Sequence, residues 1–367
     1  MSKGQLPRWV DFGLLPAINL IAAFLVSGLV VILIGENPLE AVKWLVWGAL
    51  GYGEGVGFTL FYATNFIFTG LAVAVAFHAG LFNIGGEGQA YVGGLGVALA
   101  CLAMDQFVPW YVTLPMAIIG GAAFGAGWAF IPAYLQAKRG SHIVITTIMF
   151  NFIASSLMVY LLANVLRPTG SMQPSTRGFE EGGQLPLLRH LFPAFDLGQS
   201  PVNLALFVAL IACVLVWVLI WRTKLGYEIR TFGANPNAAV YAGISPVRIT
   251  VVTMLISGAL AGLMGINEVM GAQARLLLDF TAGYGFVGIA VALMGRGHPI
   301  GIILASILFG MLYQGGAELA FEIPTITRDM IVVIQALVIL FAGALEHMFR
   351  PAVVAFFDRF AGAKAVA

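Results

Sequence analysis

Charged residues are scarce in this sequence. Only 10% of the 367 residues are Asp, Glu, Lys or Arg, while 60% are hydrophobic and the mean hydropathy is +0.94. A soluble domain carries about a quarter of its residues as charged side chains, because its surface faces water. This chain cannot cover a water-facing surface of its size, so most of its surface must face lipid. Its net charge of +1 gives no indication of a nucleic-acid partner.

Residues and motifs for catalysis or metal binding are also missing. Cys101 and Cys213 lie in separate apolar runs without metal-ligand spacing, so we interpret both as small buried hydrophobic residues. The motifs G-x-x-x-x-G-K-[ST], H-E-x-x-H and G-x-S-x-G do not occur, so we expect no metal, no cofactor and no enzyme activity. One G-x-G-x-x-G motif, at Gly283, Gly285 and Gly288, opens an apolar run. We interpret it as a flexible start to a membrane helix rather than a dinucleotide site.

Long apolar runs dominate what remains. A helix needs about 20 apolar residues to cross the hydrocarbon core. The runs predict an all-α, polytopic transmembrane bundle of about ten spans, with residues 1–367 as a single membrane domain. The predicted spans are 13–34, 57–77, 88–104, 111–133, 143–165, 203–221, 251–271, 284–296, 299–317 and 329–346. The eighth is short for a full crossing, so the span count around 284–317 stays open.

Two pairs of glycines predict close helix packing within these spans. Gly121 and Gly125 are four residues apart, as are Gly258 and Gly262. Small residues at this spacing let the backbones of two membrane helices approach each other.

Lys and Arg are distributed unevenly between the predicted connections. With the N-terminus inside, 12 of them lie in cytoplasmic segments and 6 in outer segments. The positive-inside rule favours this orientation, with both termini cytoplasmic. The two long connections are then an outer loop at 167–201, rich in Pro, Gly and Ser, and a basic cytoplasmic loop at 222–250.

A few polar side chains interrupt the apolar spans. Such groups nearly always face the bundle interior or a wet cavity. They are Asn65, Gln89, Thr146, Thr147, Asn151, Asn267, Glu268, Gln314 and Gln335. As a set they favour a weakly polar passage for a neutral, hydrogen-bonding solute, and the alternative for each one is hydrogen bonding between helices.

The segment HAGLFNIGGEGQ, residues 78–89, places four glycines among polar residues between two apolar runs. Irregular backbone at membrane depth is tolerated only beside protein or a water-filled cavity. A charged side chain at a helix centre costs on the order of 2.5–3.5 kcal/mol. We therefore expect Glu87 to lie in the cytoplasmic interface or to accept hydrogen bonds from backbone N–H groups of the next helix start. Whether 78–89 is re-entrant or a plain cytoplasmic turn stays open. The predicted substrate-pathway residues are Asn65, Asn83, Glu87, Gln89, Asn151 and Asn267.

The 222–250 loop contains signals for one short helix. Asn235 is a good N-cap, Pro236 suits the first turn and Gly243 suits the end, which predicts a helix over Pro236–Ala242. So short a helix is marginal alone in water. Its small or apolar residues, at 238–241, predict docking in a groove on another protein. The alternative is packing against this protein's own membrane surface.

Five segments resemble one known family, and they occur in the family's order. They are FNIGGEGQ (82–89), TTIMFNFIA (146–154), GYEIRTFGANPNAAVYAGI (226–244), SGALAGLMG (257–265) and GYGFVGIAVALMGRGHPIG (283–301). Together they are similar to the permease family of bacterial ATP-binding-cassette (ABC) importers for branched-chain amino acids, simple sugars and nucleosides. FNIGGEGQ is most similar to the nucleoside and simple-sugar branch. The sequence departs from the family at Ile143, where a Glu is expected, so no acid role is assigned there.

The resemblance implies a multi-pass permease in the bacterial inner (plasma) membrane. Such a permease moves a small polar solute, with a nucleoside or simple sugar favoured, inward by alternating access. The implied partners are ABC ATPase subunits, an extracytoplasmic solute-binding protein and a second permease subunit, with a heterodimer favoured over a homodimer. ATP hydrolysis is expected on the separate ATPase subunits. The solute itself is not named by the sequence.

The resemblance also gives roles to the two long connections. The 222–250 loop is implied to be the cytoplasmic coupling loop, and the 167–201 loop is expected to lie outside and help to seat the binding protein. The implied ATPase-coupling residues are Gly233, Asn235, Pro236, Ala238, Ala239 and Gly243. The main alternative is an ion-gradient-driven secondary transporter of a small neutral solute, against which sparse buried charge argues. A membrane-embedded enzyme lacks any catalytic constellation.

Overall fold

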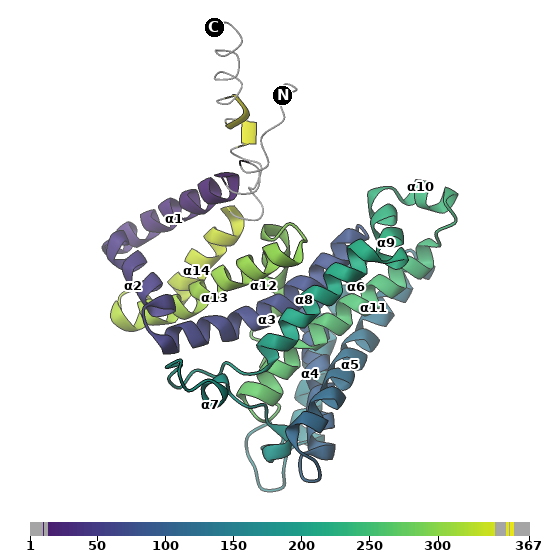
Figure 1. Cartoon of the computed structure of the whole chain (residues 1–367), viewed down its shortest axis with the longest axis horizontal. Coiled ribbons are helices and arrows are strands. Elements are labelled where there is room, and N and C mark those ends of the chain that lie inside the picture. The colour runs from purple at the N-terminus through teal and green to yellow at the C-terminus, as the bar shows by residue number, and fades with distance from the viewer. Residues whose placement is uncertain (1–9, 11–13, 342–349, 352, 356–367) are drawn as a thin grey trace, which may run out of the picture. The chain divides into compact units, whose positions relative to one another are not determined.

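The computed structural model describes Val10 and residues 14–341, 350–351 and 353–355 (Figure 1). The described residues contain no β-strand, only two isolated bridges. The described residues divide into two compact units, those that fall within 1–49 and 312–367, and those of Leu50–Met311. The termini that we expect to be cytoplasmic, 1–9 and 356–367, lie outside the described residues.

Seven helices among the described residues are long and apolar enough to cross a membrane, against about ten predicted spans. They are Ala17–Ile34, Gly53–His78, Trp110–Arg139, Ile143–Val165, Ala205–Arg222, Pro246–Ala272 and Pro299–Glu322. Each overlaps a predicted span. These crossings correspond to α1 (Leu15–Ile34), α3 (Gly53–His78), α5 (Trp110–Arg139), α6 (Ile143–Tyr160), α8 (Ala205–Arg222), α11 (Pro246–Gly262) and α13 (Pro299–Glu322). Two of them continue as π-helix, α6 through Leu161–Val165 and α11 toward η4 (Ile266–Ala272).

The other three predicted spans are also helical, but they are not among these seven. They are α4 (Gly86–Met104), α12 (Tyr284–Met294) and α14 (Arg328–Ile339). The last predicted span was drawn to 346, and its end at 342–346 lies outside the described residues. The helix α12 has only 11 residues, so it is too short to cross the hydrocarbon core alone.

Glycines bring the central helices of the 50–311 unit together. A Cβ added to Gly125 would lie 2.2 Å from the Gly258 carbonyl oxygen, and one added to Gly262 would lie 2.2 Å from the Gly121 carbonyl oxygen. The two predicted glycine pairs therefore pack against each other, which confirms close helix packing between α5 and α11. A Cβ on Gly93 of α4 would lie 2.2 Å from Gly262. The glycines of α4 thus lower its mean hydropathy, and they allow neighbouring helices to pack closely against it.

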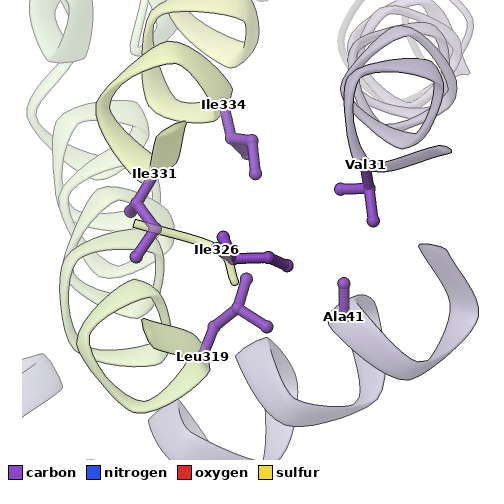
Figure 2. Close-up of a cluster of buried hydrophobic side chains, with 6 residues drawn as sticks. All are labelled: Val31, Ala41, Leu319, Ile326, Ile331 and Ile334. Carbon is purple, nitrogen blue, oxygen red and sulfur yellow. The ribbon is translucent and has the colours of Figure 1, made fainter. Parts of the chain in front are cut away.

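The other unit contains a helix that was not predicted. Residues 35–56 separate two predicted spans, and within them α2 spans Pro38–Leu50. Its start is capped by Asn37, whose Oδ1 accepts the Leu39 N–H at 3.0 Å. Figure 2 shows the apolar cluster that α1 and α2 form with the end of α13, α14 and the residue between them. It comprises Val31, Ala41, Leu319, Ile326, Ile331 and Ile334.

Both long connections of the 50–311 unit are ordered. The 222–250 loop contains α9 (Lys224–Ala234) and α10 (Pro236–Tyr241). The 167–201 loop contains a 3₁₀ turn, η3 (Glu181–Gly183), and α7 (Leu188–Leu191). Figure 1 shows α10 at the upper end of this unit's helices and α7 at the lower end.

Candidate functional site

Residues 79–85, between α3 and α4, turn back immediately after α3. Gly80 has a φ of +69°, in the left-handed region that favours glycine. The N–H of Gly80 donates to the Phe77 carbonyl at 2.9 Å, and that of Leu81 donates to the Ala76 carbonyl at 3.0 Å. The chain therefore reverses direction within two residues of the helix end.

Asn83 shows how far this segment returns into the bundle. Its Nδ2 donates to the Ser257 Oγ at 2.8 Å, and that hydroxyl donates to the Ala72 carbonyl at 2.6 Å. Ala72 precedes His78, the end of α3, by six residues, which is about 9 Å of helix. The Asn83 amide also exchanges two hydrogen bonds with the amide of Gln89. These contacts favour the re-entrant alternative over a plain turn.

Asn151 on α6 holds the same segment from another helix. Its Oδ1 accepts the Gly88 N–H at 2.9 Å, and its Nδ2 donates to the Ile84 carbonyl at 3.0 Å. Asn151 lies eight residues after Ile143, the start of α6, or about 12 Å along the helix. One side-chain amide thus satisfies a carbonyl of the segment before α4 and an N–H in the first turn of α4.

Glu87 lies between two helix N-termini. It belongs to the first turn of α4, and its two carboxylate oxygens accept the N–H groups of Gly283 at 2.9 Å and Gly285 at 2.7 Å. Those two glycines lie at the start of α12. Helix N-termini carry partial positive charge, which stabilises an anion there. The expected hydrogen bonds to a helix start are present, with the correction that the start belongs to α12 rather than to the next helix.

Close packing gives the G-x-G-x-x-G motif a structural reason beside the predicted flexible start. A Cβ at Gly285 would lie 2.3 Å from the Glu87 nitrogen, and one at Gly288 would lie 2.6 Å from the Thr69 Cβ. Gly283 has a φ of +81°. Each glycine therefore meets a steric or conformational requirement at the junction of α3, α4 and α12.

A second polar cluster joins α3 to the π-helix η4 and the start of α8. Asn65 donates to the Glu268 Oε1 at 2.6 Å, and Asn267 donates to the Asn65 Oδ1 at 2.8 Å. Asn203 donates to the Asn267 Oδ1 at 3.0 Å, and all four residues are buried. π-Helical turns occur frequently at functional sites, and a buried carboxylate in a membrane helix is by default a functional-site hypothesis.

The six predicted pathway residues thus fall into two hydrogen-bonded clusters. Asn83, Glu87, Gln89 and Asn151 form the re-entrant cluster, and Asn65 and Asn267 belong to the η4 cluster. Their polar atoms bond to one another and to backbone, an arrangement typical of the helix-packing alternative. Their role in a solute pathway stays a prediction.

Three further residues complete these clusters and were not among the predicted site residues. They are Asn203, Ser257 and Glu268. Glu268 gave a signal, because it is a carboxylate beside Asn267 in an apolar run. Asn203 and Ser257 gave none, since an amide at a span start and a hydroxyl among glycines are common packing residues.

The predicted short helix in the 222–250 loop is confirmed to within one residue as α10. The Asn235 Oδ1 accepts the Ala238 N–H at 3.1 Å, and Gly243 has a φ of +78°. The prediction that residues 238–241 form one docking surface needs correction. Ala239 is 0% exposed, whereas Val240 and Tyr241 are 54% and 93% exposed. Ala239 therefore faces the chain itself.

Gly233 of α9 connects this loop to the segment after α3. A Cβ at Gly233 would lie 2.2 Å from the His78 carbonyl oxygen, and one at Gly80 would lie 3.5 Å from the Gly233 Cα. The backbones of the loop and of the re-entrant segment are thus in direct contact. Displacement of α9 would act on the start of residues 79–85.

An ion pair fixes the 167–201 loop to the end of α4. The Arg177 guanidinium donates to both carboxylate oxygens of Asp105, at 2.7 and 2.8 Å, and the Glu180 N–H donates at 2.9 Å. The Asp105 side chain is 0% exposed. Burial alone would raise the pKa of Asp105, but the hydrogen bonds from Arg177 and Glu180 outweigh it and hold that pKa below its ordinary value.

Beside this loop is a pocket of about 570 Å³. Its polar lining includes Glu181, Arg189, His190 and Gln199. Gly271, at the end of η4, forms part of its wall. A Cβ on Gly271 would lie 2.2 Å from the amide nitrogen of Asn203, so the η4 cluster lies directly behind this wall. No group of His, Cys, Asp and Glu suited to a metal ion occurs in the described part of the chain.

Long apolar helices around buried polar clusters and a re-entrant segment define a multi-pass membrane protein of the transporter class. Residues 55–343 match the family described as "Branched-chain amino acid transport system / permease component". The chain belongs to this family of ABC transporter permeases. It is a transport subunit rather than an enzyme, and it works with ATP-binding subunits.

Individual relatives are similar in sequence to most of this chain. The glucose ABC transporter permease TsgB13 of Haloferax volcanii is 35% identical, over 97% of this chain and 93% of its own length. The guanosine ABC transporter permease NupP of Bacillus subtilis is 37% identical, over 90% and 93%. NupQ, also named as a guanosine ABC transporter permease of Bacillus subtilis, is 27% identical, over 69% and 78%.

Proposed function

We propose that this permease imports a small, neutral, hydrogen-bonding solute across the inner (plasma) membrane, with a nucleoside or simple sugar favoured. The observation that carries this proposal is the similarity, over nine-tenths of the chain or more, to permeases named for guanosine and glucose. Amide side chains form most of the two buried clusters, and amides suit hydrogen bonds to neutral solutes. Each buried carboxylate in them already accepts a hydrogen bond.

Uptake in proteoliposomes tests the proposal. With its ATPase subunits and binding protein, the permease is expected to accumulate guanosine or glucose only when ATP is supplied. The permease alone, under a proton or sodium gradient, is expected to accumulate neither. Gradient-driven uptake by the permease alone would contradict the proposal and support the secondary transporter, which the relatives do not favour.

We propose that the exposed surface of Ala238, Val240 and Tyr241 on α10 contacts the ATPase subunit. The buried Ala239 packs on the opposite side, against the chain itself. Gly233 then passes a displacement from α9 to the re-entrant segment. Apolar side chains exposed on a short capped helix support this role. Replacing Ala239 would disturb the loop itself, so Tyr241 is the better test position.

Co-purification of the ATPase subunit measures this contact. We expect Tyr241→Glu to abolish ATPase retention while the permease stays in the membrane at normal abundance, because an unpaired charge would be desolvated in the contact. Tyr111→Glu is the matched control, since Tyr111 is 62% exposed at the start of α5. Full ATPase retention by Tyr241→Glu would show that α10 is not the contact.

We propose that the second permease subunit is a different chain. Two guanosine permeases of one Bacillus, NupP and NupQ, are both similar to this chain, which supports a pair of related but distinct permeases. Purification through a tag on this chain is expected to recover a second permease. Recovery of two differently tagged copies of this chain, in an active complex without another permease, would contradict it.

We propose that the 167–201 loop lies outside the membrane and helps to seat the extracytoplasmic binding protein. Its fixation by Arg177 and its pocket give it a defined surface, which does not fit the alternative of a flexible connector. Met172 is 96% exposed, so Met172→Cys reports the side of this loop. We expect an impermeant thiol reagent to label it rapidly in intact cells. Labelling only from the cytoplasmic face would contradict the orientation.

For the solute pathway, we propose that the two polar clusters exchange their mutual hydrogen bonds for bonds to the solute when the helices separate. Gln89→Leu is then expected to raise the KM for uptake without reducing ATPase retention. Gln335→Leu is the control, because Gln335 donates to the Leu312 carbonyl within the other unit. An unchanged KM in Gln89→Leu would leave that residue with a packing role alone.

A further inference from the structure

An apolar groove lies between α8 and the first turn of α13, within the 50–311 unit. Its volume is about 350 Å³, within the range of sites that hold small ligands. The face of α8 that lines it follows i, i+3, i+4, i+7 spacing, as one side of a helix does. The lining residues include Leu210, Cys213, Val214 and Trp217 on α8, and Pro299 and Ile300 on α13.

This groove opens on the lipid-facing surface of the bundle. Val214 is 60% exposed and Ile300 is 65% exposed, and both are apolar. Such side chains on a membrane-spanning helix face the hydrocarbon region. The groove is therefore a recess in a surface that lipid already covers.

A cation contacts Trp217, one of the residues that line the groove. Arg222, in the last turn of α8, is exposed, and its guanidinium carbon lies 5.0 Å from the ring centroid of Trp217. Arg222 makes no ion pair to a carboxylate of the described residues, unlike Arg177, Lys224 and Arg248. Trp and Arg at a helix end are typical of the level of the lipid headgroups. The charge of Arg222 thus lacks an anion from the described protein.

We propose that this groove binds one anionic phospholipid, with an acyl chain between α8 and α13 and the phosphate against Arg222. The positive charge of Arg222 indicates which ligand fits. An anionic phospholipid has an apolar chain for the apolar groove and a negative headgroup for this cation. Trp217 and Arg222 are five residues apart, about 7.5 Å along the helix. The distance along α8 from the apolar lining to the charge is therefore similar to the distance from the start of an acyl chain to the phosphate of a phospholipid. Basic sites at the ends of membrane helices bind anionic headgroups in this way.

Native mass spectrometry of the full-length permease tests the site, with phosphatidylglycerol and phosphatidylcholine of identical chains as probes. We expect one phosphatidylglycerol to be retained per chain in preference to phosphatidylcholine. Arg222→Gln is expected to weaken phosphatidylglycerol binding about fivefold. Arg139→Gln is the control, since Arg139 is an exposed cation in the last turn of α5.

A second pair of variants tests the groove itself. Val214→Trp is expected to fill the groove and abolish retention of the lipid. Leu215→Trp is the control, because Leu215 is 63% exposed on α8 but does not line the groove. Equal retention by all four variants, or equal binding of the two lipids by the wild type, would overturn the proposal.

Photo-crosslinking supplies a test that needs no variant. Phosphatidylglycerol with a diazirine on its acyl chain is expected to attach to peptides containing residues 210–217 and 299–303 of the wild-type chain. Attachment only elsewhere would contradict the proposal. Loss of a second permease chain from Val214→Trp, with the lipid retained, would identify the groove as a protein interface and would also overturn it.

Discussion

Two connecting segments of the 50–311 unit are held in opposite ways. In the re-entrant segment, Asn83 bonds to Ser257 and Glu87 bonds to Gly283, across 174 and 196 residues of sequence. In the 222–250 loop, the side-chain bonds that begin the helices span three residues. These local bonds join Thr223 to Gly226, Asn235 to Ala238 and Ser245 to Arg248.

From this difference we infer one element that is held in place and another that can move as a body. A segment held by partners on three other helices cannot shift without breaking several buried hydrogen bonds. A loop whose helices are capped locally keeps its shape when it moves as a body, and such elements open at low free energy. Backbone contacts of Gly233 with His78 and Gly80 join the two segments, and through them we expect a displaced loop to act on the re-entrant segment.

Glu87→Leu tests the fixed segment most severely. It leaves the part-buried N–H groups of Gly283 and Gly285 without an acceptor. A fully buried unsatisfied donor costs about 1–3 kcal/mol, and partial access to solvent lowers that cost. We expect a large fall in the thermal unfolding temperature of the purified permease and little protein in the membrane. Glu40→Leu is the control, because Glu40 is an exposed acid in the first turn of α2. Equal melting temperatures of both variants would show that Glu87 does not hold the re-entrant segment in place.

Gly285→Ala tests the same junction sterically. The new Cβ would lie 2.3 Å from the Glu87 nitrogen, so a backbone must shift, at about 1–3 kcal/mol. Gly127→Ala is the control, because no atom lies within 4 Å of the position its Cβ would take. Alanine is the better helix former by up to about 1 kcal/mol, so this control is expected to melt at or above the wild-type temperature. Similar melting of the two variants would argue against close packing at Gly285.

Asp105 tests whether the 167–201 loop belongs with the fixed or the movable elements. Ser175 is 3% exposed, so a Cys placed there reports opening of this loop in a chain whose own cysteines are replaced. We expect Asp105→Asn to speed labelling of Ser175→Cys, while Met172→Cys, at a 96% exposed position, labels rapidly in both backgrounds. Unchanged labelling of Ser175→Cys would show that the ion pair does not hold the loop.

The same reporter checks the pH dependence of this ion pair. The pKa of Asp105 is held below its ordinary value of 3.8 in the folded state, so its contribution is fully present above that pH. It is lost only as the pH falls through the lowered pKa. The thiolate fraction of every cysteine falls with pH, so the labelling rate of Ser175→Cys is taken relative to that of Met172→Cys at the same pH. This ratio is expected to be constant from neutral pH to about pH 4. A higher ratio already at pH 5–6 would assign the opening to another group.

The contrast between local and distant bonds also decides what the sequence could predict. The limits of α10 followed from Asn235, Pro236 and Gly243, because caps act within one turn. The burial of Ala239 did not follow, since the face that a short helix turns inward depends on the rest of the fold. The acceptor role of Glu87 was expected, but its partner at Gly283 lies 196 residues away.

Helix prediction failed where charge interrupted the apolar pattern. The helix α2 was missed because Glu40 and Lys43 lie within its 13 residues, so its sequence looks like a connection. The helix α12 was recognised as short, but its start against Glu87 could not be inferred from composition. Hydropathy measures contact with lipid, whereas these helices are specified by contact with protein.

Asn235→Ala is expected to have the smallest effect on the fold. Loss of an N-cap costs about 0.5–2 kcal/mol, and here that loss falls on α10 alone, whose side-chain cap spans three residues. Melting of the whole permease is expected to stay at the wild-type temperature, because the framework around Glu87 does not depend on this bond. Hydrogen exchange at 236–241 is expected to accelerate, and ATPase retention to fall in proportion. Asn237→Ala is the matched control, since Asn237 is exposed in the same helix and does not cap it. A drop in the melting temperature of Asn235→Ala comparable to that of Glu87→Leu would show that the stability of the whole permease depends on the 222–250 loop. The two connections would then not differ as a movable and a fixed segment.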